Sequence, residues 1–77
     1  MTVKAYLLIE VQVGQTKQVV EAIHKLGGGV ASVDTVAGPY DIIAVIQGET
    51  LDDIGELITA KVGAVAGITR TVTCLAL

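Results

Sequence analysis

The stretch that decides the fold is "YDIIAVIQGETLDDIGELITAKV", residues 40–62, in which the hydrophobic period changes once. Residues 40–47 are expected to form a strand in which residues 42–46 are apolar at consecutive positions, which is typical of a strand covered on both faces. Residues 50–62 then change to helical spacing. The apolar stripe of this expected helix consists of Leu51, Ile54, Leu57, Ile58 and Val62. The stretch therefore predicts a central strand followed by a helix.

The start of this helix carries a signal of its own. Thr50 precedes the apolar stripe and Asp53 follows three positions later, which predicts a capping box with Asp in place of the usual Glu. Asp52 and Asp53 also place negative charge in the first turn, where it interacts favourably with the helix dipole. Gly55 lies inside the helical pattern and is expected to cost about 1 kcal/mol relative to alanine.

The first half of the chain shows the same two periods. Residues 3–13 are apolar at every odd position, which predicts a strand with one face on the core, ended by Gly14. Residues 16–26 follow with helical spacing, with Thr16 as the expected N-cap and Gly27 as the expected end.

Two further strands complete the pattern. Residues 30–36 form a less regular strand after a run of three glycines at 27–29, which is interpreted as a flexible connection. Residues 37–40 form the turn to the central strand, and residues 68–76 alternate again. The chain thus repeats the order strand, helix, strand twice.

This order predicts an α+β protein with the ferredoxin-like βαββαβ arrangement. Right-handed crossovers and a tight middle turn give a four-stranded antiparallel sheet with both helices on one face. The other face, which carries Tyr6 and Leu8, is bare in a monomer. A second sheet stacked on it in a dimer would cover that surface, giving a dimeric α+β barrel. Residues 1–77 are expected to form a single domain.

The composition supports this expectation of assembly. Of 77 residues, 52% are hydrophobic and 17% are charged, which is more apolar material than one small core hides. The chain is therefore expected to form a homo-oligomer.

Composition also excludes several kinds of site. A single cysteine, Cys74, forms no disulfide within the chain and fits a reducing, cytoplasmic compartment. We expect Cys74 to be a buried structural thiol and His24, the single histidine, to be a surface residue. Together they cannot build a metal cluster, so no metal and no cofactor are expected. The basic residues are scattered and no apolar run is long enough for a membrane span, so we expect neither direct nucleic-acid binding nor membrane insertion.

The main candidate for a ligand-binding site is "GPYD", residues 38–41, with two readings left open. As a turn, Pro39 presets φ and Asp41 bonds a nearby backbone amide. As a binding site, Gly38 allows close approach of a ligand and Asp41 offers a carboxylate to an ammonium group. Thr71 and Thr73 add hydroxyl donors, although β-propensity alone also accounts for threonines in a strand.

Three strings together resemble the effector-sensing domain of the Lrp/AsnC family of transcriptional regulators. They are "LIEVQVGQTKQVVEAI", "VDTVAGPYDIIAVIQGETLDDIGELI" and "GITRTVTCLAL", and they span essentially the whole chain. The family pattern places G-x-Y-D between the two middle strands and a threonine-rich closing strand at the end. Here these motifs fall on residues 38–41 and 67–73. The chain departs from the pattern in the connections, where Gly14 and the glycines at 27–29 replace the usual prolines.

The resemblance implies a ferredoxin-like fold, dimers formed through the sheets, and rings of dimers such as an octamer. It also implies that an amino acid or a related small molecule binds between subunits near Gly38, Tyr40 and Asp41, with Thr71 and Thr73 as further candidates. The chain resembles the stand-alone members, which lack a DNA-binding domain and associate with DNA-binding relatives. It is expected to be non-catalytic.

Three alternatives remain at this point. A structural oligomerisation module would form the assembly and bind nothing. An ACT-like regulatory domain shares the element order and amino-acid binding, but it usually accompanies an enzyme. A small enzyme of the dimeric α+β barrel type would need a His, Tyr or Asn in an enclosed cavity, and one surface histidine argues against it.

Overall fold

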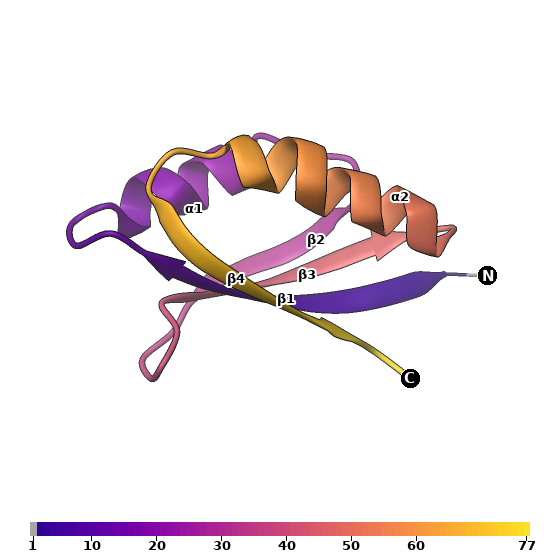
Figure 1. Ribbon diagram of the computed structural model, residues 1–77, viewed down its shortest axis with the longest axis horizontal. Helices are drawn as coiled ribbons and strands as arrows, with labels where there is room; N and C mark the ends of the chain where they lie inside the picture. Colours follow the sequence, from indigo (N-terminus) through magenta and orange to yellow (C-terminus); the bar gives the residue numbers. More distant parts are fainter. Residues whose placement is uncertain (1) are drawn as a thin grey trace.

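The computed structural model describes residues 2–77 and has the predicted element order. The strands and main helices are β1 (Val3–Val11), α1 (Thr16–His24), β2 (Val30–Thr35), β3 (Ile42–Gly48), α2 (Leu51–Glu56) and β4 (Ile68–Leu75). The four strands form one antiparallel sheet in the order β2-β3-β1-β4. Both helices lie on the same face of this sheet (Figure 1). The ferredoxin-like prediction is therefore confirmed.

The core lies between the helices and the sheet. Ala5, Leu7 and Ile9 of β1 are fully buried, as the alternation predicts. On the neighbouring strand β3, Ile42, Ala44 and Ile46 lie on the same side and are also fully buried. The helices cover these residues with Val19, Ile23, Ile54, Leu57 and Val62. The two central strands thus carry most of the apolar contact with the helices.

The first strand and first helix differ from the prediction at their shared boundary. β1 ends at Val11 and not at Val13, because the chain turns at residues 12–15, where Gln15 donates its backbone N–H to the carbonyl of Gln12. Val13 is fully exposed in that turn. Thr16 is the first helical residue and not the N-cap. Gln15 occupies the cap position without a side-chain hydrogen bond, so the cap prediction was wrong.

The second helix begins as predicted and changes geometry halfway. Thr50 Oγ1 accepts the Asp53 amide at 3.1 Å, and Asp53 Oδ2 accepts the Thr50 amide at 3.3 Å, so the capping box is confirmed. After Glu56 the helix widens to a π-helical turn, η1 (Leu57–Lys61), and ends as a 3₁₀ turn, η2 (Val62–Ala64).

The π turn explains how the helical stripe meets the core. Leu57 and Val62 are both buried although they are five residues apart. In an α-helix, five residues rotate by about 140° beyond a full turn, which would place them on different faces. The wider turn brings both to the sheet. Leu51, at the other end of the predicted stripe, is 56% exposed and does not reach the core.

The sheet face away from the helices is apolar at its centre. The cross-strand register aligns Tyr6 with Val45 and Cys74, and Leu8 with Ile43 and Val72. Tyr6 is 38% exposed and the Lys4 ammonium lies 5.0 Å from its ring centroid. Cys74 is exposed on this face, so the prediction of a buried thiol was wrong for the single chain. We call this surface, centred on Tyr6, Leu8, Ile43, Val45 and Val72, the open face.

Candidate functional site

The connection between β2 and β3 is a tight loop whose tip is solvent-exposed. Val36 donates its backbone N–H to the carbonyl of Asp41 at 2.9 Å, which closes the loop at its base. Gly38 and Pro39 at the tip are exposed, and Tyr40 is half-buried. The loop projects from the sheet on the side away from the helices (Figure 1). The chain therefore presents Gly38 to Tyr40 outward on a fixed base.

Gly38 has a backbone conformation that few other residues adopt. Its φ is +153°, and a Cβ added there would meet no atom within 4 Å. The requirement for glycine thus comes from the backbone and not from crowding. The space around the residue is open.

Asp41 is held at the base of this loop by three hydrogen bonds. Its backbone N–H donates to the carbonyl of Ile9 at 2.9 Å, and its own carbonyl accepts the Val36 amide. Its side-chain Oδ2 accepts the Val11 amide at 3.0 Å, in a partly buried position. One residue therefore joins the end of β1, the end of β2 and the start of β3. Asp41 was expected to bond a nearby backbone amide of the turn; it does accept a backbone amide, but that amide belongs to Val11, thirty positions away in the chain.

The strand register explains why the Val11 amide is available to a side chain. The β1–β3 ladder ends where Ile9 faces Ile42, so no β3 residue continues alongside Val11. On the other side of β1, the pairing with β4 shifts between Glu10 and Val11. The Asp41 carboxylate takes the place of the missing strand neighbour and satisfies a backbone donor that would otherwise lack a protein partner.

The two candidate threonines lie on β4, across β1 from this loop. Thr71 faces Ile9 in the register, so Thr71 and Asp41 flank the same part of β1 on opposite sides. Thr73 faces Leu7, one step further from the loop. Both threonines are exposed. Within one chain, the structure therefore brings Gly38, Tyr40 and Asp41 together and leaves the threonines on a neighbouring strand.

Thr73 instead lines a groove between β4 and the second helix. This groove has a volume of about 860 Å³ and includes Leu75 of β4 and Ile54, Ile58 and Leu51 of the helix. Leu51 and Leu75 remain exposed at its rim. The residues of the β2–β3 loop do not line this groove.

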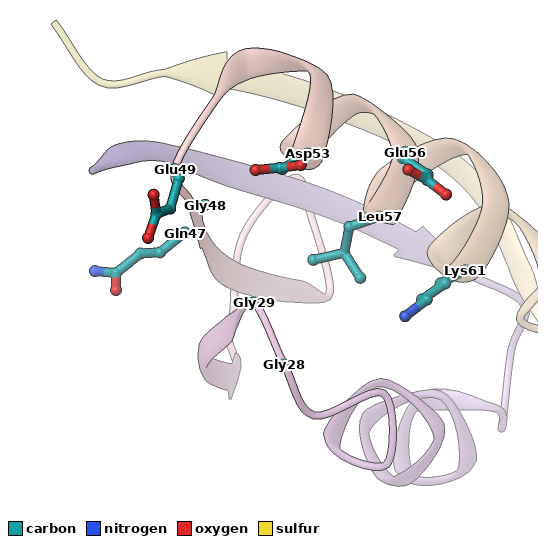
Figure 2. Close-up of a pocket in the computed structure, with 9 residues that line it drawn as sticks. All are labelled: Gly28, Gly29, Gln47, Gly48, Glu49, Asp53, Glu56, Leu57 and Lys61. Carbon is teal, nitrogen blue, oxygen red and sulfur yellow. The ribbon is translucent and has the colours of Figure 1, made fainter. Parts of the chain in front are cut away.

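A second hollow lies at the end of the sheet opposite the β2–β3 loop. Figure 2 shows the residues that line it. It has a volume of about 430 Å³ and lies between Gly28–Gly29, the end of β3 and the helix that follows. Its polar side chains are Gln47, Glu49, Asp53, Glu56 and Lys61. Asp53 is already engaged in the capping box. Because β2 starts and β3 ends here, this hollow is separated from the Gly38 loop by the length of both strands.

Residues 2–77 were also searched for metal sites and for membrane-spanning helices. No group of three or more His, Cys, Asp or Glu side chains among residues 2–77 is arranged to hold a metal ion. His24 is exposed, as expected. Over the same residues, the helices are too short or too polar to cross a bilayer.

Comparison with known proteins identifies the family. Residues 4–77 match the model of the Lrp/AsnC ligand binding domain, and the chain therefore belongs to this family. No sequence among the curated proteins matches the chain significantly.

Several solved structures share this fold. TTHA0845 from Thermus thermophilus is 31% identical, with a TM-score of 0.90 over 97% of this chain and 92% of that one. FFRP-DM1 is 29% identical, with a TM-score of 0.90 over 97% and 99% of the two chains. The regulator NMB0573 from Neisseria meningitidis, solved as a complex with L-Met, is 10% identical, with a TM-score of 0.84 over 97% of this chain and 49% of that one. At this identity, the likeness to NMB0573 concerns the fold alone.

Sequence reasoning did not find the partner of Asp41. Val11 contributes a backbone N–H, which has no side-chain signature, and it lies thirty positions away in the chain. The alternation of the first strand gives no signal for this bond, because it runs to Val13 whereas the β1–β3 ladder already stops at Ile9.

Proposed function

We propose that this chain is a non-catalytic sensing module that binds an amino acid and thereby modulates transcription. The observation that carries the proposal is the match of residues 4–77 to the Lrp/AsnC ligand binding domain. The complex of NMB0573 with L-Met supports an amino acid as the class of effector.

The proposed effector site is the loop at Gly38, Tyr40 and Asp41, with Thr71 and Thr73 as further contributors. The open space around Gly38 leaves its backbone accessible to a small ligand. An amino acid is a zwitterion, so its carboxylate needs N–H or hydroxyl donors and its ammonium needs carbonyl or carboxylate acceptors. Exposed threonine hydroxyls and the loop backbone supply both kinds of group.

We further propose that the site is completed between subunits. The loop and the threonines of one chain lie on opposite sides of β1, and a second chain would bring such groups together. Stacking of two sheets through the open face would bury Tyr6, Leu8 and Val72 and form a dimer. The family resemblance extends this to rings of dimers, such as octamers, and to association with DNA-binding relatives.

Titration calorimetry against each of the twenty L-amino acids tests the effector proposal. The expected result is a saturable heat for one or a few of them, with one ligand per subunit or per subunit pair. Absence of any response, with the assembly intact in light scattering, would contradict effector sensing.

The open face also favours a second candidate, an oligomerisation module without ligand. Leu8→Glu places a charge at the centre of this face, and Val13→Glu places the same charge at a fully exposed position elsewhere. We expect L8E to give monomers in size-exclusion chromatography with light scattering and V13E to keep the wild-type mass. If L8E keeps the assembly, the open face is not the interface.

A further inference from the structure

Asp41 holds the base of the proposed effector loop through three hydrogen bonds. Its backbone N–H and its side-chain Oδ2 bond to Ile9 and Val11 of β1, and its backbone carbonyl bonds to Val36 after β2. By contrast, Gly38 at the tip of the same loop is exposed, and a Cβ added there would meet no atom within 4 Å. The loop thus has an anchored end and a free end.

We propose that Asp41 is a positioning residue that fixes the loop on β1 as a hydrogen-bond acceptor, and that its negative charge is not what recognises the effector. This inference rests on the proposed function, because it divides the roles within the proposed site. Gly38 and Tyr40 then contact the ligand, and Asp41 fixes the position of these two residues relative to β1.

The chemistry of the Asp41 contact supports this division. Its side-chain donor is a neutral peptide N–H, and the 3.0 Å distance is that of an ordinary N–H···O bond. An amide oxygen can accept such a bond with the same geometry as a carboxylate oxygen. The role therefore requires an acceptor at this side-chain length and does not require a charge.

The location of the donor shows what Asp41 positions. Val11 lies where the β1–β4 register shifts, next to the bond from Gln12 to Gly67. The bond from Val11 to Asp41 therefore connects the loop to the same part of β1 that aligns β4, including Thr71. Loss of the acceptor frees the loop to move relative to β4, and the two halves of the proposed site lose their fixed spacing.

Two substitutions separate positioning from charge recognition. Asp41→Asn keeps an acceptor oxygen at the same distance and removes the charge. Asp41→Ala removes both. Each variant is titrated with the twenty L-amino acids separately, and hydrogen exchange of the Val11 amide is followed by NMR in the ligand-free protein.

The expected result is rescue by asparagine. D41N is expected to bind within about threefold of the wild-type affinity and to keep Val11 protected from exchange. D41A is expected to lose at least tenfold in affinity and most of the protection at Val11. Such a rescue would not occur if the carboxylate bound the ammonium of the effector directly.

Several outcomes would overturn the inference. An affinity loss in D41N as large as in D41A would assign the charge to ligand recognition, and unchanged binding in D41A would remove Asp41 from the site. Failure of D41N to fold would contradict the acceptor role. If D41A does not fold, D41N alone decides.

If the wild type binds no amino acid, the proposed function fails while the Val11 exchange still reports on Asp41. Equal protection of Val11 in the wild type and D41A would then overturn the positioning role.

Discussion

Gly29 and Gly38 stand beyond the two ends of β2, and they are glycines for different reasons. A Cβ on Gly29 would lie 2.6 Å from the carbonyl oxygen of Gln47 and 3.0 Å from Leu57 Cδ2. A Cβ on Gly38 would meet nothing within 4 Å, and only its φ of +153° disfavours a side chain. One glycine is enclosed by the fold, and the other faces open space.

The two glycines therefore mark different ends of the sheet. At Gly29 the protein's own backbone fills the space, whereas at Gly38 the space is accessible to other molecules. At Gly29 the chain is fixed to β3, where Gln47 donates its backbone N–H to the Gly29 carbonyl at 2.7 Å. The interpretation of residues 27–29 as a flexible connection is therefore wrong for Gly29. At Gly38 the fold anchors only the base of the loop, through Asp41, and leaves the tip free for a ligand or a partner subunit.

The largest effect is expected for Gly29→Ala. The added methyl group would collide with backbone that cannot move without breaking the β2–β3 pairing, so we expect a loss of about 2–3 kcal/mol in the free energy of unfolding. Urea denaturation at one fixed subunit concentration measures it.

Gly28→Ala is the matched control for this prediction. Gly28 has a φ of +49°, and its nearest neighbour for a Cβ is at 3.9 Å, so this change carries a backbone cost without a collision. We expect about 1 kcal/mol. Equal losses at Gly28 and Gly29 would show that the close approach to Gln47 is unimportant.

A smaller loss of stability is expected for Gly38→Ala. The unfavourable φ costs about 1 kcal/mol, which the exposed loop relieves in part by rearranging. The same rearrangement displaces the loop tip, so amino-acid binding is expected to weaken more than stability does. Unchanged affinity in calorimetry, with the expected loss of stability, would remove Gly38 from the proposed site.

The smallest effect, and the only stabilising one, is expected for Gly55→Ala. Gly55 lies in α2 with open space around it and without a positive φ, so neither reason for glycine applies. Alanine should raise the free energy of unfolding by about 0.5–1 kcal/mol. A loss of stability in urea would indicate that α2 needs the flexibility of glycine at this position.

The comparison of Gly29 with Gly38 also shows what the sequence could predict and what it could not. The strands and helices follow from local periods, and the Thr50–Asp53 capping box from a spacing of three residues, so both were predicted. The close approach at Gly29 and the bond from Val11 to Asp41 join segments far apart in the chain. They depend on the register of the sheet, which no local pattern determines.

One error at an element end has a local origin. β1 stops at Val11 because the chain turns at residues 12–15, where the Gln15 amide donates to the Gln12 carbonyl. The helix stripe was predicted with a uniform period, whereas the π turn from Leu57 to Lys61 changes the phase so that Leu57 and Val62 both reach the sheet. Tertiary packing decided this change of phase.

The most direct test is an NMR titration of the assembled protein with each amino acid that gives heat in calorimetry. Our account predicts that backbone amide shifts change at Gly38, Tyr40 and Asp41 and along β4 from Thr69 to Thr73. Changes confined to the hollow formed by Gly28, Gln47 and Lys61, with none in the loop, would contradict it.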